Sequence, residues 1–81
     1  MDNDETGFLK KYCVRFGVIA VKKGYIKEDN LFEALKLQVE EDLNDDEHRL
    51  IGTILYDLGM MSEKEIEDVV NELIKEKEES L

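Results

Sequence analysis

Apolar residues recur every three or four positions along nearly the whole chain, and no stretch alternates apolar and polar residues with a period of two. This spacing is typical of amphipathic helices and argues against strands. The first half predicts one helix from about Thr6 to Lys23, ended by Gly24, and a second from about Glu28 to Asp42. The apolar face of the first contains Phe8, Leu9, Tyr12, Cys13, Phe16, Ile19 and Ala20, and that of the second contains Leu31, Ala34, Leu35, Gln38 and Val39.

The second half predicts two further helices. The polar stretch NDDEH at 44–48 is interpreted as a loop and the start of a third helix that ends at Gly59. The fourth helix has the clearest start, because Ser62 and Glu65 have the spacing of a capping box, with apolar residues on both sides of it. The apolar face of the third helix contains Leu50, Ile51, Ile54, Leu55 and Leu58, and that of the fourth contains Ile66, Val69, Val70, Leu73 and Ile74.

The two halves of the chain resemble each other after a shift of 35 positions. Four pairs of residues are then identical: Gly17 with Gly52, Ile19 with Ile54, Gly24 with Gly59, and Glu28 with Glu63. Residues 15–38 and 50–73 are therefore interpreted as two copies of one unit, each a helix, a glycine stop and a second helix. The expected fold is all-α, a single domain over 1–81 with two helical hairpins related by an internal repeat, and with 1–5 and 76–81 flexible.

Charge is distributed unevenly along the chain. The net charge of −10 disfavours DNA, RNA or an anionic membrane surface as a partner. Residues 10–27 nevertheless contain six bases and no acid, whereas 44–81 contain twelve acids and four bases. Two interpretations of the basic stretch stay open at this point. It could bind an anion, or it could pair with the acidic second half of the same chain.

Few residues point to chemistry. The only cysteine, Cys13, lies on an apolar face and is expected to be a buried hydrophobic residue rather than part of a disulfide. No spacing marks an acid–base pair or a metal site, so we expect a non-enzymatic protein without cofactor or metal. No apolar run approaches the roughly 20 residues that span a bilayer, so we do not expect membrane insertion. The first residues are acidic, unlike those of a signal peptide, so we expect a cytoplasmic location.

The first copy, RFGVIAVKKGYIKEDNLFEALKLQ at 15–38, resembles a known repeated motif. It is similar to the motif of the N-terminal, MshE-like, cyclic-di-GMP-binding domain of type II secretion and type IV pilus assembly ATPases. The second copy departs from this motif, since Leu50 and Leu73 stand where it has arginine and glutamine. The chain also lacks the phosphate-binding sequence GxxxxGK(S/T) of the ATPase itself, so a stand-alone domain is expected. The matching positions are Arg15, Gly17, Val21, Gly24, Ile26, Leu31, Ala34, Leu35 and Gln38.

The resemblance implies a nucleotide site in the first copy. Arg15 would contact phosphate or guanine, Gly17 would admit the ligand closely, and Gln38 would bond a base edge. The other candidate contacts are Val21, Gly24, Leu31 and Leu35. The competing interpretation is that Arg15 and Gln38 are ordinary surface residues, and that Gly17 and Gly52 serve close packing between helices.

Two functions from different classes follow. The first is a regulatory protein-docking module that resembles the secretion ATPase domain. A protein partner would contact its acidic surface around Glu67, Asp68 and Glu72, and weak nucleotide binding is left open. The alternative is a sensing domain that binds cyclic-di-GMP or a similar anionic nucleotide through the first copy. The missing arginine and glutamine of the second copy favour docking.

Overall fold

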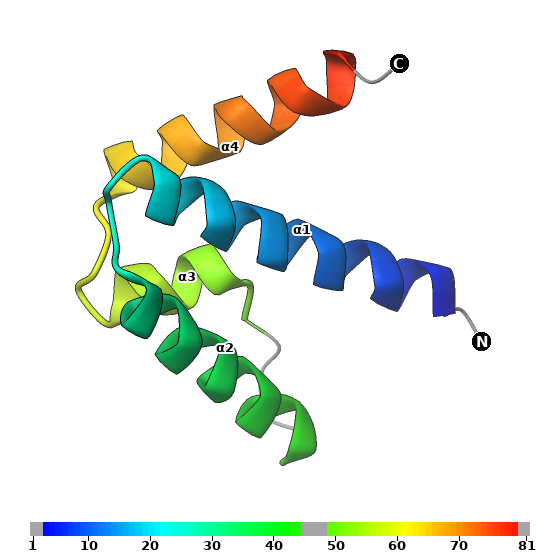
Figure 1. Ribbon diagram of the computed structural model, residues 1–81. Coiled ribbons are helices and arrows are strands. Elements are labelled where there is room, and N and C mark those ends of the chain that lie inside the picture. Colours follow the sequence, from blue (N-terminus) through cyan, green and yellow to red (C-terminus); the bar gives the residue numbers. More distant parts are fainter. Residues whose placement is uncertain (1–2, 45–48, 80–81) are drawn as a thin grey trace.

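The computed structural model describes residues 3–44 and 49–79, which form four α-helices and, over these ranges, no strand. The helices are α1 (Asn3–Lys22), α2 (Glu28–Leu43), α3 (Ile51–Asp57) and α4 (Glu63–Glu79) (Figure 1). The predicted all-α class with four helices is thus confirmed. None of the helices in these ranges is long and apolar enough to cross a membrane.

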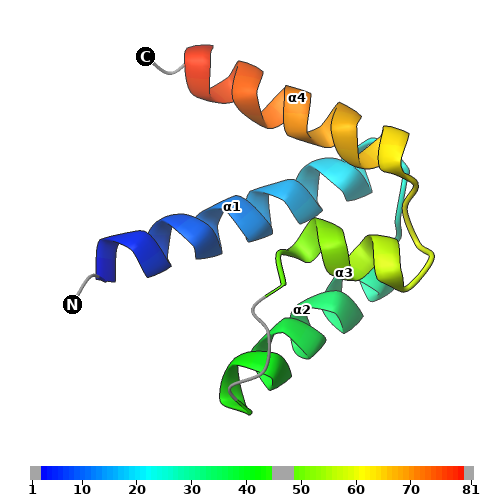
Figure 2. The ribbon, with the colours of Figure 1, turned by 180° about the vertical axis from the view of Figure 1, so that it is seen from behind.

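Helix α1 is the central element of the fold. It runs between α4 on one side and α2 with α3 on the other, as both views show (Figures 1 and 2). The most extensive helix packing joins α1 to α4, α2 to α3 and α1 to α3, whereas α1 with α2 and α3 with α4 pack less extensively. Each predicted hairpin is therefore open, and the two halves of the chain bury their apolar faces mainly against each other.

The two glycine turns have the same backbone geometry. Gly24 and Gly59 have φ values of 81° and 76°, in the left-handed region that glycine adopts without strain. In the first turn the amide of Tyr25 donates to the carbonyl of Ala20 at 3.0 Å, and in the second the amide of Met60 donates to that of Leu55 at 2.9 Å. These bonds close the Schellman pattern at a helix end. The likeness between the two halves of the chain is limited to these turns, because the helices before them differ in length, with 20 and seven residues.

The helix ends differ from the sequence predictions at three places. The third helix begins at Ile51, with Leu50 as its N-cap, and Asn44 still caps α2. The rest of the NDDEH stretch lies outside the described residues. Residues 3–5 belong to α1, which begins before the expected Thr6, and residues 76–79 belong to α4. The flexibility of 1–5 and 76–81 stays a prediction.

The core lies where α1, α3 and α4 meet and extends to the first half of α2. Its fully buried side chains are Phe16, Ile51, Ile54, Leu55 and Val69, and Cys13 is buried beside them, as predicted. Four residues assigned to apolar faces are instead at least 40% exposed: Val39, Leu50, Leu58 and Ile74. Those assignments were wrong because a neighbouring helix covers only part of a helix's circumference. These residues lie at the edge of the covered part or at a helix end.

Candidate functional site

Arg15, the predicted phosphate contact, is engaged by α4. Its Nε donates to Glu76 Oε1 at 2.9 Å, and its Nη2 donates to Glu76 Oε2 at 2.7 Å. This paired arrangement matches the planar fork of guanidinium to the two oxygens of a carboxylate. The same pair lowers the pKa of Glu76 and raises that of Arg15. The anion that Arg15 binds in the folded chain is thus a side chain of the chain itself.

Gln38, the predicted base-edge contact, faces the interior. Its Nε2 donates to Cys13 Sγ at 3.2 Å and to the backbone carbonyl of Arg49 at 3.1 Å. Cys13 and Arg15 are two positions apart on α1, so their side chains leave the helix about 200° apart around its axis. Arg15 and Gln38 therefore lie on opposite sides of α1 and do not form one polar surface.

Gly17 serves the close packing of α1 on α2. A Cβ at Gly17 would lie 2.3 Å from Leu31 Cδ1, a distance that no real Cβ contact shows. Gly52 is packed more loosely, since a Cβ there would lie 3.2 Å from Phe16 Cζ. Of the two interpretations of these glycines, helix packing is the one that the contacts show. The remaining candidate contacts are a core residue, two half-buried residues beside the core and a helix end: Leu31, Val21, Leu35 and Gly24.

The basic stretch is paired with the acidic last helix at two points. Besides the pair of Arg15 with Glu76, Lys23 Nζ lies 3.1 Å from Asp68 Oδ2. The hydroxyl of Tyr25 donates to the same oxygen of Asp68. The Tyr25 hydroxyl and, second, Lys23 hold the pKa of Asp68 below its ordinary value. Asp68 therefore joins α4 to the turn that follows α1, so it is not a free member of the acidic surface expected to meet a partner.

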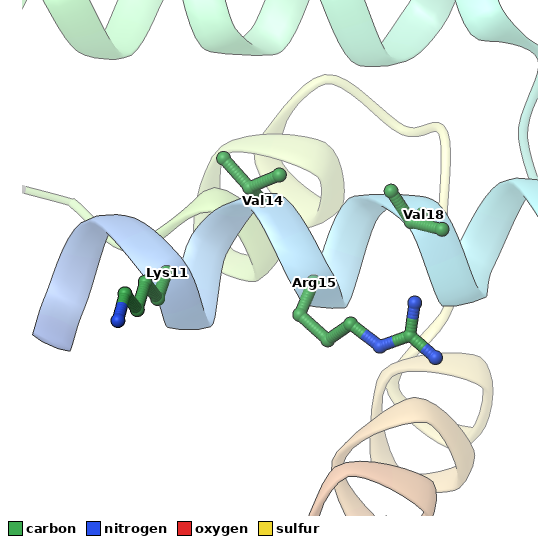
Figure 3. Close-up of a pocket in the computed structure, with 4 residues that line it drawn as sticks. All are labelled: Lys11, Val14, Arg15 and Val18. Carbon is green, nitrogen blue, oxygen red and sulfur yellow. The ribbon is translucent and has the colours of Figure 1, made fainter.

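The outward side of α1 carries Lys11 and Arg15 beside two valines, Val14 and Val18 (Figure 3). The guanidinium of Arg15 reaches toward α4, whereas the valines point to the opposite edge of the helix. The described residues that line this hollow all come from one helix. A surface built by a single helix has no opposing wall, so it does not enclose a small ligand.

Arg49 is an organising residue that the sequence analysis missed. Its guanidinium forms ion pairs with Glu41 at the end of α2 and, at 2.7 Å, with Asp57 at the end of α3. These contacts join α2 to α3, and the hydrogen bonds from Arg49 lower the pKa of Glu41. A sequence signal existed, because Arg49 is the only lysine or arginine between Lys36 and Lys64.

A stripe of exposed apolar side chains runs along α2. Phe32, Val39 and Leu43 are 61%, 56% and 78% exposed. Their spacing of seven and four positions places them on one side of the helix. We call these three residues the α2 outer face. Three exposed acids flank it on the same helix: Asp29, Glu33 and Glu40.

Comparisons with protein-family models, with curated proteins and with solved structures give no match to this chain. The resemblance of residues 15–38 to the secretion ATPase domain accordingly stays a prediction.

Proposed function

We propose that this chain is a non-enzymatic docking module that binds an amphipathic, basic helix of a protein partner on the α2 outer face. The observation that carries the proposal is the exposure of Phe32, Val39 and Leu43 in one stripe. Removing such side chains from water stabilises a complex by about 1.5–3 kcal/mol each, before the costs of association. A helix laid in an apolar stripe is a common mode of peptide recognition.

The charge beside the stripe selects the sign of the partner. Asp29, Glu33 and Glu40 flank the α2 outer face and outnumber Lys36, an exposed base that lies on the same face between Phe32 and Val39. Lysines or arginines on the partner helix would complement this acidic edge and speed the encounter. A second copy of the chain is the poorer occupant, because two copies of the same acidic edge repel each other.

The contacts of the motif residues also support docking over nucleotide sensing. A dinucleotide held by Arg15 would have to displace the carboxylate of Glu76. One held by Gln38 would have to displace the bonds to Cys13 and to the Arg49 carbonyl. Both exchanges lower the net gain from ligand contacts, because the hydrogen bonds lost offset those formed.

The test uses a synthetic amphipathic helix of leucine and lysine as the probe, followed through the backbone amide shifts of the protein. We expect saturable shifts confined mainly to 28–43. The double variant Phe32→Ser with Val39→Ser should abolish them, whereas Ile74→Ser, which replaces an apolar residue of similar exposure on α4, should leave them in place. Shifts that spread evenly over every acidic helix, or that survive the double substitution, would contradict the proposal.

A titration with cyclic-di-GMP separates the two function classes. On the docking proposal, saturating nucleotide leaves the amides of 15–38 unshifted. Saturable shifts in that range that disappear in Arg15→Ala would instead favour the sensing domain. A sedimentation measurement of the chain alone completes the test, since a stable dimer that Phe32→Ser dissociates would make a second copy the occupant of the α2 outer face.

A further inference from the structure

A second surface, distinct from the α2 outer face, lies where α1, α3 and the beginning of α4 meet. Figure 2 shows the molecule from the side on which α3 lies in front. The three helices border a cleft of about 520 Å³, in the size range of ligand sites. Its lining includes the aromatic residues Tyr12, Phe16 and Tyr56, the carboxylates Glu63 and Glu67, and the aliphatic residues Ile66 and Val70.

Aromatic rings from two helices line the cleft. Tyr12 and Phe16 of α1 have ring centroids 6.4 Å apart, and Tyr56 of α3 is 47% exposed. Burial raises the pKa of Tyr12, so its phenol is neutral in the physiological range. The face of an aromatic ring attracts a cation through its quadrupole, and this attraction grows where water is partly excluded.

Two carboxylates of α4 also line the cleft. Glu63 and Glu67 are one helical turn apart on α4, and both are exposed. Like charges at this spacing repel each other and destabilise a helix slightly. Among the described residues that line the cleft there is no lysine, arginine or histidine. The cleft thus combines aromatic rings with two carboxylates that no other described lining residue neutralises.

We infer that this cleft binds a cationic side chain, an arginine, presented by a protein partner. Its planar guanidinium would stack on the exposed ring of Tyr56 and pair with Glu63 and Glu67. Its aliphatic stem would lie against Ile66 and Val70. The site contains neither Phe32 nor Val39, so arginine binding in the cleft can be tested independently of docking on the α2 outer face.

The decisive probe is N-acetylarginine amide, compared with N-acetylcitrulline amide, which has nearly the same shape without the charge. The arginine compound should shift the amides of Thr53, Ile66, Glu67 and Val70 in a saturable manner, and the citrulline compound should bind about tenfold more weakly or not at all. The double variant Glu63→Gln with Glu67→Gln should weaken arginine binding by about tenfold. The matched control, Glu33→Gln with Glu40→Gln, removes the same charge from α2 and should change affinity by less than about twofold.

A second pair of variants tests the aromatic contribution. Tyr56→Phe keeps a ring and should retain arginine binding, whereas Tyr56→Leu should weaken it. Because this side chain is half exposed, we expect both variants to keep the circular dichroism of the unchanged domain. Equal responses to arginine and citrulline would overturn the inference. Equal losses in the two double glutamine variants would overturn it as well, because they would show attraction to net charge alone.

Discussion

Arg15 and Glu76 join the first helix to the last through two hydrogen bonds, of 2.9 Å and 2.7 Å, between residues 61 positions apart. Arg15, which was predicted to contact a phosphate, therefore forms a structural ion pair in the folded chain. Both side chains remain partly exposed, at 45% and 34%. Exposed pairs of this kind contribute little and are screened by salt.

The first prediction concerns this pair. In a double-mutant cycle with Arg15→Ala and Glu76→Ala, we expect a favourable coupling in the free energy of unfolding at low salt that disappears at high salt. Lys11→Ala with Glu76→Ala is the control and should show no coupling, because Glu76 bonds Arg15 instead. A coupling that persists in molar salt would show that the pair is shielded from solvent more than its exposure indicates.

The second prediction is that Gly17→Ala destabilises the fold. In an open helix this change stabilises by about 1 kcal/mol, because glycine is the poorer helix former. Here the added Cβ would lie 2.3 Å from Cδ1 of Leu31, which is only 7% exposed. Overpacking of this kind costs about 1–3 kcal/mol. We therefore expect a net loss of about 1 kcal/mol in chemical denaturation.

A second substitution checks the cause of that loss. Leu31→Ala alone should cost about 2–5 kcal/mol as a cavity mutation. In the Gly17→Ala background it should cost less, because it also relieves the overlap. Gly52→Ala, where the nearest atom is Phe16 Cζ at 3.2 Å, should be milder than Gly17→Ala. Simple additivity of the two substitutions at 17 and 31 would rule out the proposed clash.

The third prediction tests the start of α4. The predicted capping box is present, since the amide of Glu65 donates to Ser62 Oγ at 3.2 Å and the amide of Ser62 donates to Glu65 Oε1 at 3.0 Å. Ser62→Ala removes the cap oxygen and should cost about 1 kcal/mol of unfolding free energy. Ser62→Asp keeps an acceptor at the same place and should retain most of the stability. Equal losses in the two variants would show that the cap bond contributes nothing.

The fourth prediction concerns pH. The hydroxyl of Tyr25 and, second, Lys23 lower the pKa of Asp68 below its ordinary value of 3.8. This contribution to stability is present above pH 3.8 and is lost as the pH falls through the lower pKa of the folded state. In Tyr25→Phe we expect the pKa of Asp68 to rise toward 3.8, measured from its carboxyl carbon shift, and the acid-dependent loss of stability to shrink. Tyr56→Phe is the control and should leave that pKa unchanged.

The sequence alone determined the local features of this protein. The helical spacing of apolar residues, the capping box at Ser62, and the stops at Gly24 and Gly59 each depend on a few neighbouring residues. The buried position of Cys13 was also predicted, because a residue in the centre of an apolar face is covered from whichever direction the neighbouring helix approaches. A residue at the edge of a face is covered only where the neighbouring helix reaches it, and Val39 and Ile74 proved exposed.

The tertiary structure decided which residues became partners. The sequence was compatible with two roles for Arg15, binding of an anion or pairing with an acidic residue of the second half. The packing of α1 on α4 places Arg15 against Glu76. It likewise placed Gln38 against Cys13, on the far side of α1 from Arg15. Local spacing does not encode these choices, because the direction in which helices cross depends on how all their side chains fill the core at once.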